Sequence, residues 1–232
     1  MEDHVAEALA SLDESRTGHP VIYVAGGGWF GKTTIVRKVL GMPAGRVNRP
    51  EDYLEPFDPP DLPEWARAKN NRGIPIVKHP GKEGGRPVLR KGDVLYVHAL
   101  CGNARSYAEL AHLLRYTQAH GPLLAESKLL GKLITDHPTA YPFYVFTLDI
   151  SAEEHTSRAL QRGLTGELGP TGIRKTEDRI RSEATAEYES WHRIRLPALK
   201  SSVEDAGGQI GYLREDPVAE LKSFIATQGY QL

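Results

Sequence analysis

A glycine-rich segment at residues 26–33, which reads Gly-Gly-Gly-Trp-Phe-Gly-Lys-Thr, sets the strongest limit on the possible folds of this chain. An apolar run at residues 21–25 comes directly before it, and apolar side chains at helical spacing follow it. The pattern G-x-x-x-x-G-K-[ST] between a strand and a helix is typical of a loop that wraps around the phosphates of a nucleotide. We therefore expect a strand, a phosphate-binding loop and a helix, in that order. The alternative interpretation is a glycine-rich turn that binds nothing.

Each part of this loop is suited to holding a nucleoside triphosphate. Glycines let successive backbone N–H groups converge on the phosphates, and the N-terminus of the next helix adds the positive end of its dipole. Lys32 is predicted to reach the β- and γ-phosphate oxygens, and the Thr33 hydroxyl is predicted to hold Mg²⁺. The side chains of Trp29 and Phe30 are expected to pack in the core or beside the acceptor. The predicted nucleotide-binding residues of the loop are Gly26, Gly28, Trp29, Phe30, Gly31, Lys32, Thr33 and Thr34.

The chain as a whole alternates strand patterns with helix patterns. Such alternation predicts an α/β fold in which a parallel sheet is flanked by helices, and the length of 232 residues fits a single domain over residues 1–232. Ligands of such sheets bind beyond the carboxyl ends of the strands. Besides residues 21–25, the predicted strands of the sheet are 122–125, 141–148 and 209–213.

Three features predict helices in the second half of the chain. Ser151 and Glu154 have the spacing of a capping box at a helix start. A glycine-rich loop at residues 163–176 separates that helix from a long one, and Asp216-Pro217 is predicted to begin a last helix. The apolar stripe of the long helix consists of Ile180, Ala184, Tyr188 and Trp191.

The stretch from about residue 43 to residue 100 is predicted to be a small β-rich insertion. Its first part, residues 42–63, is rich in proline and acidic residues, which is typical of an extended loop or flap. Its second part holds the β-prone segments 74–77, 87–90 and 93–99, with a hairpin turn predicted at Lys91-Gly92.

Two carboxylates follow predicted strands directly. Glu126 ends the run 122–125, and a hydroxyl acceptor would need such a group to orient it or take its proton, so Glu126 is a candidate catalytic residue. The alternative for Glu126 is a surface carboxylate at a strand end. Asp149 ends the run 141–148 and is a candidate Mg²⁺ ligand together with Thr33.

From Phe143 onward, the chain resembles the thymidylate kinase family, within the wider group of P-loop nucleoside monophosphate kinases. The similar segments are the strand that ends Thr-Leu-Asp-Ile-Ser, the helix with Arg158 and Arg162-Gly163, and the run Glu-Asp-Arg-Ile-Arg-Ser-Glu at 177–183. The resemblance implies a lid at about residues 162–178 that closes over ATP. It also implies that Arg162 and Arg174 stabilise the transferring phosphoryl group, with Arg158, a nucleotide-binding candidate, and Arg179 in reserve.

The predicted function is therefore that of an ATP- and Mg²⁺-dependent kinase. The resemblance favours a nucleotide or nucleoside acceptor, first a (deoxy)nucleoside monophosphate. Monophosphate acceptors need basic clamps, and Arg46, Arg49 and Arg105 lie in loop-like segments suited to that. Because Ala-Glu-Ser-Lys at 125–128 is closer in charge to the Glu-Arg-Ser of deoxynucleoside kinases, a kinase of a hydroxyl on a modified nucleoside, nucleic-acid base or other small molecule stays open. A P-loop ATPase without an acceptor is the third possibility.

Composition limits the partners and the compartment. The net charge of −1 provides no overall field toward nucleic acid or anionic membrane, although a local basic groove remains possible. Cys101 is the one cysteine, so we expect no internal disulfide and a reducing, cytoplasmic location. The acidic N-terminus does not resemble a signal peptide, and no apolar run approaches the length of a membrane span. The family resemblance allows a homodimer.

Overall fold

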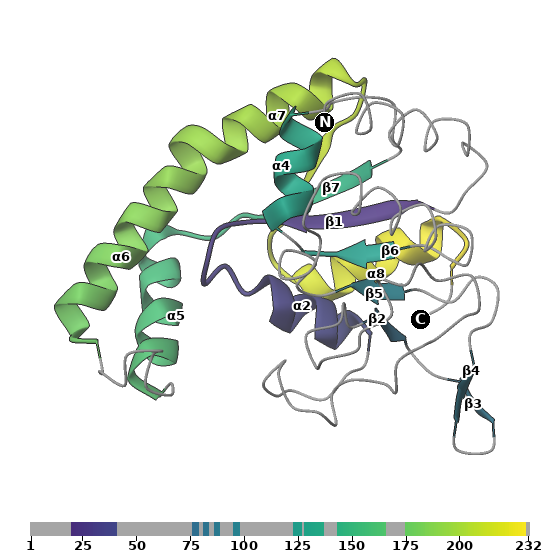
Figure 1. Ribbon diagram of the computed structural model, residues 1–232, viewed down its shortest axis with the longest axis horizontal. Coiled ribbons are helices and arrows are strands. Elements are labelled where there is room, and N and C mark those ends of the chain that lie inside the picture. Colours follow the sequence, from purple (N-terminus) through teal and green to yellow (C-terminus); the bar gives the residue numbers. More distant parts are fainter. Residues whose placement is uncertain are drawn as a thin grey trace, which may run out of the picture.

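A six-stranded sheet forms the centre of the protein (Figure 1), with strand order β2-β5-β6-β1-β7-β8. The computed structural model describes residues 20–40, 76–78, 81–83, 86–88, 95–97, 123–126, 128–136, 143–165 and 175–230. The strands of the sheet are β1 (Val21–Ala25), β2 (Ile76–Lys78), β5 (Leu95–Val97), β6 (Leu123–Ala125), β7 (Phe143–Leu148) and β8 (Ile210–Leu213).

β1 lies inside the sheet between two parallel neighbours. Ile22 is aligned with Leu124 of β6 on one side and with Tyr144 of β7 on the other. All five residues of β1 are buried, as expected for a continuous apolar run in a parallel sheet that is covered on both faces. β5 and β8 extend the parallel arrangement outward, and among the six described strands of this sheet β2, at one edge, is the one that runs antiparallel to its neighbour. The predicted α/β fold with a parallel sheet is confirmed.

β1 is the strand at which the order of the strands in the sheet reverses. After β1 the chain forms β5 and β6 on one side of it, and then β7 and β8 on the other side. The carboxyl ends of β1, β6 and β7 therefore meet at one edge of the sheet. In open α/β sheets this kind of position is where ligands bind.

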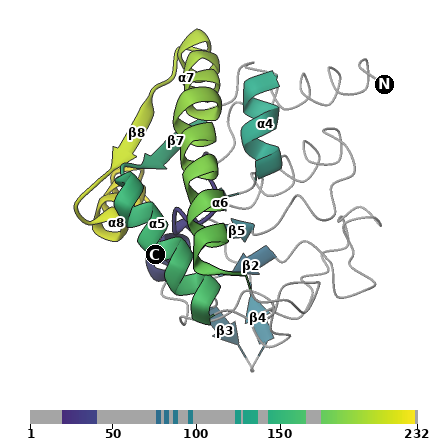
Figure 2. The same cartoon turned by 90° about the vertical axis from the view of Figure 1, so that its left-hand side faces the viewer.

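Helices cover both faces of the sheet. α2 (Lys32–Val39) packs against α8 (Pro217–Thr227), and α4 (Lys128–Asp136) packs against α7 (Leu196–Asp205). Figure 2 shows α8 and α4 on opposite sides of the strands. The predicted start of the last helix is confirmed, because Asp216 Oδ1 accepts a hydrogen bond of 3.0 Å from the Ala219 N–H. None of the described helices is long and apolar enough to cross a membrane.

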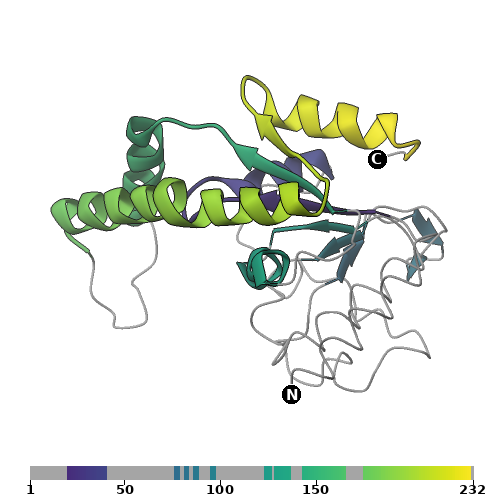
Figure 3. The ribbon, with the colours of Figure 1, turned by 90° about the horizontal axis from the view of Figure 1, so that it is seen from above.

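Two further helices, α5 (Ala152–Thr165) and α6 (Glu177–Ser190), lie side by side and extend away from the sheet (Figures 1 and 2). We call this pair the helical arm. The predicted cap is present, since Ser151 Oγ accepts from the Glu154 N–H at 3.0 Å. α6 continues through a π-helical turn, η4 (Trp191–Arg195), into α7, and Figure 3 shows the three as one long rod.

The predicted start of the loop over residues 163–176 is wrong, because Gly163 lies within α5, where it packs closely against α6. A Cβ atom at Gly163 would lie 2.5 Å from Ile180 Cδ1. The glycine is therefore where two helices approach closely, and its neighbours Ala159 and Ala184 are small and fully buried for the same reason.

The predicted hairpin is also wrong. β4 (Arg86–Val88) pairs with β3 (Gly81–Glu83) in a separate two-stranded antiparallel sheet, whereas β5 pairs with β2 and β6 in the main sheet. Two glycines lie between β3 and β4 in the sequence, a combination that favours a tight turn. The β-prone residues of β5 are instead satisfied by strands on both sides. The expected flap at 42–63 lies outside the described residues.

Candidate functional site

The glycine loop, residues 26–33, leaves β1 at its carboxyl end and enters α2. Three of its residues have positive φ: Gly26 at 155°, Trp29 at 61° and Gly31 at 86°. Glycine is needed at 31 in particular, because its φ of 86° lies in the left-handed region that other side chains rarely adopt. The Lys32 side chain folds back over the loop and donates to the carbonyl oxygens of Gly26 at 2.9 Å and Gly27 at 2.5 Å. The ammonium group is thus held at the mouth of the loop.

A carboxylate from a neighbouring strand meets the end of this loop. Glu126 follows β6 directly, is 7% exposed, and accepts a hydrogen bond of 2.8 Å from the Thr33 hydroxyl. The two residues are 93 positions apart in the sequence and are brought together because β6 lies beside β1. The structure therefore joins a predicted metal ligand, Thr33, with a predicted catalytic residue, Glu126.

Asp149, the other predicted metal ligand, has a different partner. Its carboxylate is exposed and forms an ion pair with Arg214 at 3.3 Å. The strand registers explain the difference: Ala125 is aligned with Tyr23, whereas Thr147 is aligned with Ala25. Asp149 therefore lies further in the direction of the strands, beyond their carboxyl ends, than Glu126 does. There it meets Arg214, the residue that follows β8. Of the two predicted carboxylates, the one that contacts Thr33 is Glu126.

The two bulky residues of the glycine loop pack, as expected. Phe30 is fully buried and its ring lies among the rings of His155, Tyr188 and Trp191, with centroid distances of 4.8 to 6.2 Å. Trp29 is partly buried against the cluster between α5 and α6. Phe30 thus attaches the loop both to the main core and to the helical arm, and Trp29 attaches it to the cluster between α5 and α6.

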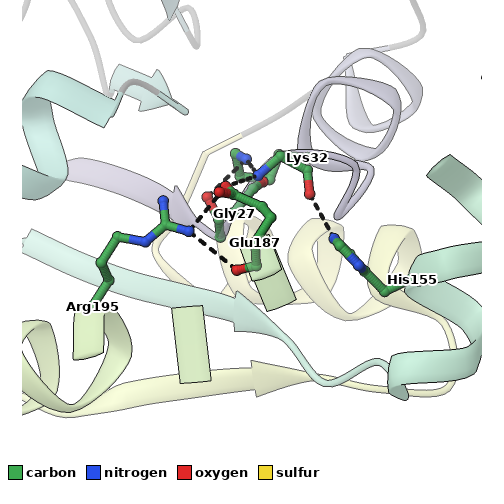
Figure 4. A network of polar contacts seen from close by, with 7 residues as sticks. Gly27, Lys32, His155, Glu187 and Arg195 are labelled. Carbon is green, nitrogen blue, oxygen red and sulfur yellow. Dashed lines mark hydrogen bonds and ion pairs between the residues drawn. The ribbon is translucent and has the colours of Figure 1, made fainter. Parts of the chain in front are cut away.

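The part of the helical arm that carries His155, Arg158 and Glu187, which we call its base, also binds the main chain of the loop. Figure 4 shows this for His155 and Glu187. The His155 Nε2–H donates to the carbonyl oxygen of Gly28 at 2.8 Å, and the Gly28 N–H donates to Glu187 Oε1 at 2.6 Å. Arg158 Nη1 donates to the carbonyl oxygen of Phe30 at 2.6 Å. Both polar groups of Gly28 are therefore held by side chains of the arm, one from each of its helices.

Burial favours the neutral form of His155. Its ring is fully buried, and its Nδ1 has no hydrogen-bond partner within the described part of the chain. Burial lowers the pKa of His155 below the ordinary histidine value, although the bond to Gly28 and the nearby Glu187 act in the opposite direction. The neutral ring has its one N–H on Nε2, where it donates to Gly28.

Arg195, in the π-helical turn, completes the group of charges at this edge. It forms an ion pair of 2.9 Å with Glu187 Oε1 (Figure 4). Burial raises the pKa of the Tyr23 phenol above its ordinary value, the charge of Glu126 raises it further, and the charge of Arg195 lowers it. The charges of Arg195 and Glu126 therefore both influence the Tyr23 phenol on β1.

The arginines that the family resemblance implies for a lid are in different surroundings. Arg158 contacts the glycine loop, as described above. Arg162 is exposed one turn further along α5, and Arg179 is exposed at the start of α6, where it pairs with Glu183 at 3.0 Å. The remaining candidates lie outside the described residues: Arg174, Arg46, Arg49 and Arg105.

Sequence reasoning missed three residues that contact the loop or its immediate partner, namely His155, Glu187 and Arg195. Each lies on a helix whose sequence is rich in charged and polar residues, so the sequence pattern does not distinguish these three residues from solvent-facing neighbours.

In sequence comparisons, no protein-family model and no curated protein matches the chain.

Proposed function

We propose that this protein is an ATP-dependent phosphotransferase. The observation that carries the proposal is the contact of 2.8 Å between the Thr33 hydroxyl and the Glu126 carboxylate, on the loop that also holds the Lys32 ammonium group. A lysine, a hydroxyl and a strand-end carboxylate at the mouth of a glycine loop are the parts that phosphoryl transfer uses to hold a triphosphate and its metal ion. The helix N-terminus beneath them favours the anionic tail.

The residues present fit Mg²⁺. This ion prefers oxygen ligands, keeps several of its waters, and is usually held by one or two carboxylates together with substrate phosphates. Thr33 and Glu126 would hold it, and it would supply positive charge to the β- and γ-phosphates. In this arrangement Lys32 exchanges its two carbonyl partners for phosphate oxygens, and the buried Glu126 keeps the Thr33 hydroxyl oriented.

We infer a nucleotide acceptor, first a (deoxy)nucleoside monophosphate, as in the thymidylate-kinase-like P-loop kinases that the second half of the chain resembles. The helical arm is compatible with this inference, because the lid that the resemblance implies lies between α5 and α6 in the sequence, and Arg162 lies on α5. The contact of Glu126 with Thr33 favours a metal-holding role over that of a base for a hydroxyl acceptor. We expect the enzyme to act in the cytoplasm.

Binding of Mg-ATP to the intact protein is the first test. Calorimetry is expected to detect binding by the wild-type protein and a loss of about a hundredfold or more in affinity for Lys32→Ala, because a charged phosphate contact is removed. Lys38→Ala, on the exposed side of the same helix, is the matched control and should bind as the wild type does. Equal binding by Lys32→Ala would overturn the proposal.

The acceptor is tested with labelled ATP and panels of nucleosides, nucleoside monophosphates and DNA. A labelled product that requires a monophosphate supports the proposal, and one that requires a nucleoside or DNA assigns a hydroxyl acceptor instead. Phosphate release that no compound in the panels changes would identify an ATPase. Glu126→Gln is expected to raise the Mg²⁺ concentration needed for half-maximal turnover, which a role limited to the acceptor would leave unchanged.

A further inference from the structure

An anionic group of the protein itself lies on the glycine loop. Glu187 Oε1 accepts a hydrogen bond of 2.6 Å from the Gly28 N–H, and a Cβ built on Gly27 would lie 3.0 Å from the same oxygen. The carbonyl oxygen of Gly27 accepts from the Lys32 ammonium group. The carboxylate is therefore beside the part of the loop to which Lys32 reaches, and it has the type of contact with a loop N–H that a phosphate oxygen makes.

Arg195 holds this carboxylate while keeping other donors available. Its Nη2 lies 2.9 Å from Glu187 Oε1 and 3.3 Å from the main-chain oxygen of Glu187, and its Nε is buried with no hydrogen-bond partner in the described part of the chain. A guanidinium group has five N–H donors in a fork that suits phosphate. Arg195 is thus a charged donor next to the loop with unsatisfied capacity.

The π-helical turn accounts for the placement of Arg195. In a regular α-helix, residues 187 and 195 would be about 80° apart around the axis, because each residue turns the helix by about 100°. A π turn contains an extra residue, so each of its residues turns the helix by a smaller angle. The turn over Trp191–Arg195 therefore brings Arg195 back toward the face of α6 that carries Glu187. Such turns often occur at functional sites.

We propose that Arg195 is a further phosphate-binding residue of the glycine loop, and that Glu187 takes the place of a phosphate oxygen on the Gly28 N–H until a polyphosphate binds. The inference rests on the proposed function. An incoming polyphosphate displaces the Glu187 carboxylate from Gly28 and provides Arg195 with a stronger, bidentate partner. The ligand class is a nucleoside triphosphate or another polyphosphate, and nucleosides without phosphate do not compete with Glu187.

The experiment measures the affinity of the full-length protein for Mg-ATP, for magnesium tripolyphosphate and for adenosine by calorimetry. Glu187→Gln keeps the shape of the side chain and removes its charge, so it is expected to bind both polyphosphates about tenfold more tightly. Arg195→Ala is expected to bind them about tenfold more weakly, and Arg195→Lys should lie between Arg195→Ala and the wild type, because an ammonium group provides a charge without the fork. Adenosine binding should be the same in all variants.

Glu189 and Arg193 provide matched controls on the same helix. They form an exposed pair of 3.8 Å, so Glu189→Gln and Arg193→Ala change the net charge by the same amounts as the test variants. These controls should bind polyphosphate as the wild type does. Thermal unfolding shows whether each variant is folded, and Arg195→Lys replaces Arg195→Ala if the alanine variant does not fold.

Opposite changes in affinity for the Glu187 and Arg195 variants support the inference. If both variants bind more tightly, Arg195 only holds Glu187 on the loop, and the inference is overturned. It is also overturned if the wild type binds polyphosphate and the test variants differ from it no more than the controls do, in which case the proposed function stands. Binding by neither the wild type nor any variant would overturn the proposed function as well.

Discussion

The base of the helical arm and its outer part are both rich in charged side chains, but they use them differently. At the base, Arg158 and Glu187 bond to main-chain atoms of the glycine loop, and the Glu187 side chain is only 24% exposed. In the outer part, Arg181 pairs with Glu177 one turn away, and both side chains are about half exposed. Exposed pairs of this kind contribute little to stability. The arm thus joins a base that is bonded to the loop to an outer part with a solvated surface.

The largest effect should come from the aromatic attachment at the base. Phe30→Ala removes a fully buried ring and leaves a cavity, which is expected to lower the free energy of unfolding by about 3–5 kcal/mol. Chemical denaturation measures the loss. Trp29→Ala, at a partly buried position beside it, should cost clearly less. Equal losses for the two variants would mean that the loop is not anchored through Phe30.

Arg158→Ala is expected to have an intermediate effect. The substitution removes the hydrogen bond to the Phe30 carbonyl oxygen, and bonds of this charged type contribute about 1–2 kcal/mol when they are partly exposed to water. The comparison variant is Arg162→Ala, one turn further along the same helix and exposed, which should be close to neutral. If the two arginine variants unfold at the same denaturant concentration, the difference between base and outer part does not hold for α5.

Acid should weaken the base of the arm before its outer part. Because burial lowers the pKa of His155 in the folded protein, the unfolded chain takes up this proton at higher pH than the folded protein does. The stability due to neutral His155 is therefore complete above the ordinary histidine pKa of about 6.5 and is lost as the pH falls through the lower, folded value. Burial also lowers the pKa of His192, which acts in the same direction.

Denaturation curves from about pH 7.5 down to about pH 5 measure this loss. His155→Gln should reduce the pH dependence, and the double variant with His192→Gln should reduce it further. A pH dependence that is unchanged in the double variant would assign the loss to other groups.

The smallest effect is expected for the outer part. Arg181→Ala breaks the exposed pair with Glu177, and its change in the free energy of unfolding should be within about 0.5 kcal/mol. The same denaturation experiment measures it, and added salt should reduce the difference further. A loss comparable to that of Arg158→Ala would show that the outer part also depends on its charges.

Much of the fold follows from short stretches of sequence. The apolar run 21–25 becomes the buried centre of the sheet, and Ile180, Ala184 and Trp191 become the buried stripe of a long helix. Strand pairing could not be predicted in the same way, because β-prone segments do not specify their partners. The hairpin predicted at Lys91-Gly92 was wrong for this reason. Strand pairing depends on which other strands are available, and here β5 pairs with β2 and β6.

The same distinction between local structure and long-range pairing applies to the candidate site. The glycine loop with Lys32 and Thr33 can be read from the residues alone, since a strand, a turn with positive φ and a helix start are set by local residue types. The contact of Thr33 with Glu126 rather than Asp149, and that of Gly28 with Glu187, arise from the way distant segments pack in the folded protein. These contacts join residues 93 and 159 positions apart. Backbone conformation is governed by near neighbours, whereas the partner of a charged side chain depends on where strand register and helix packing place it.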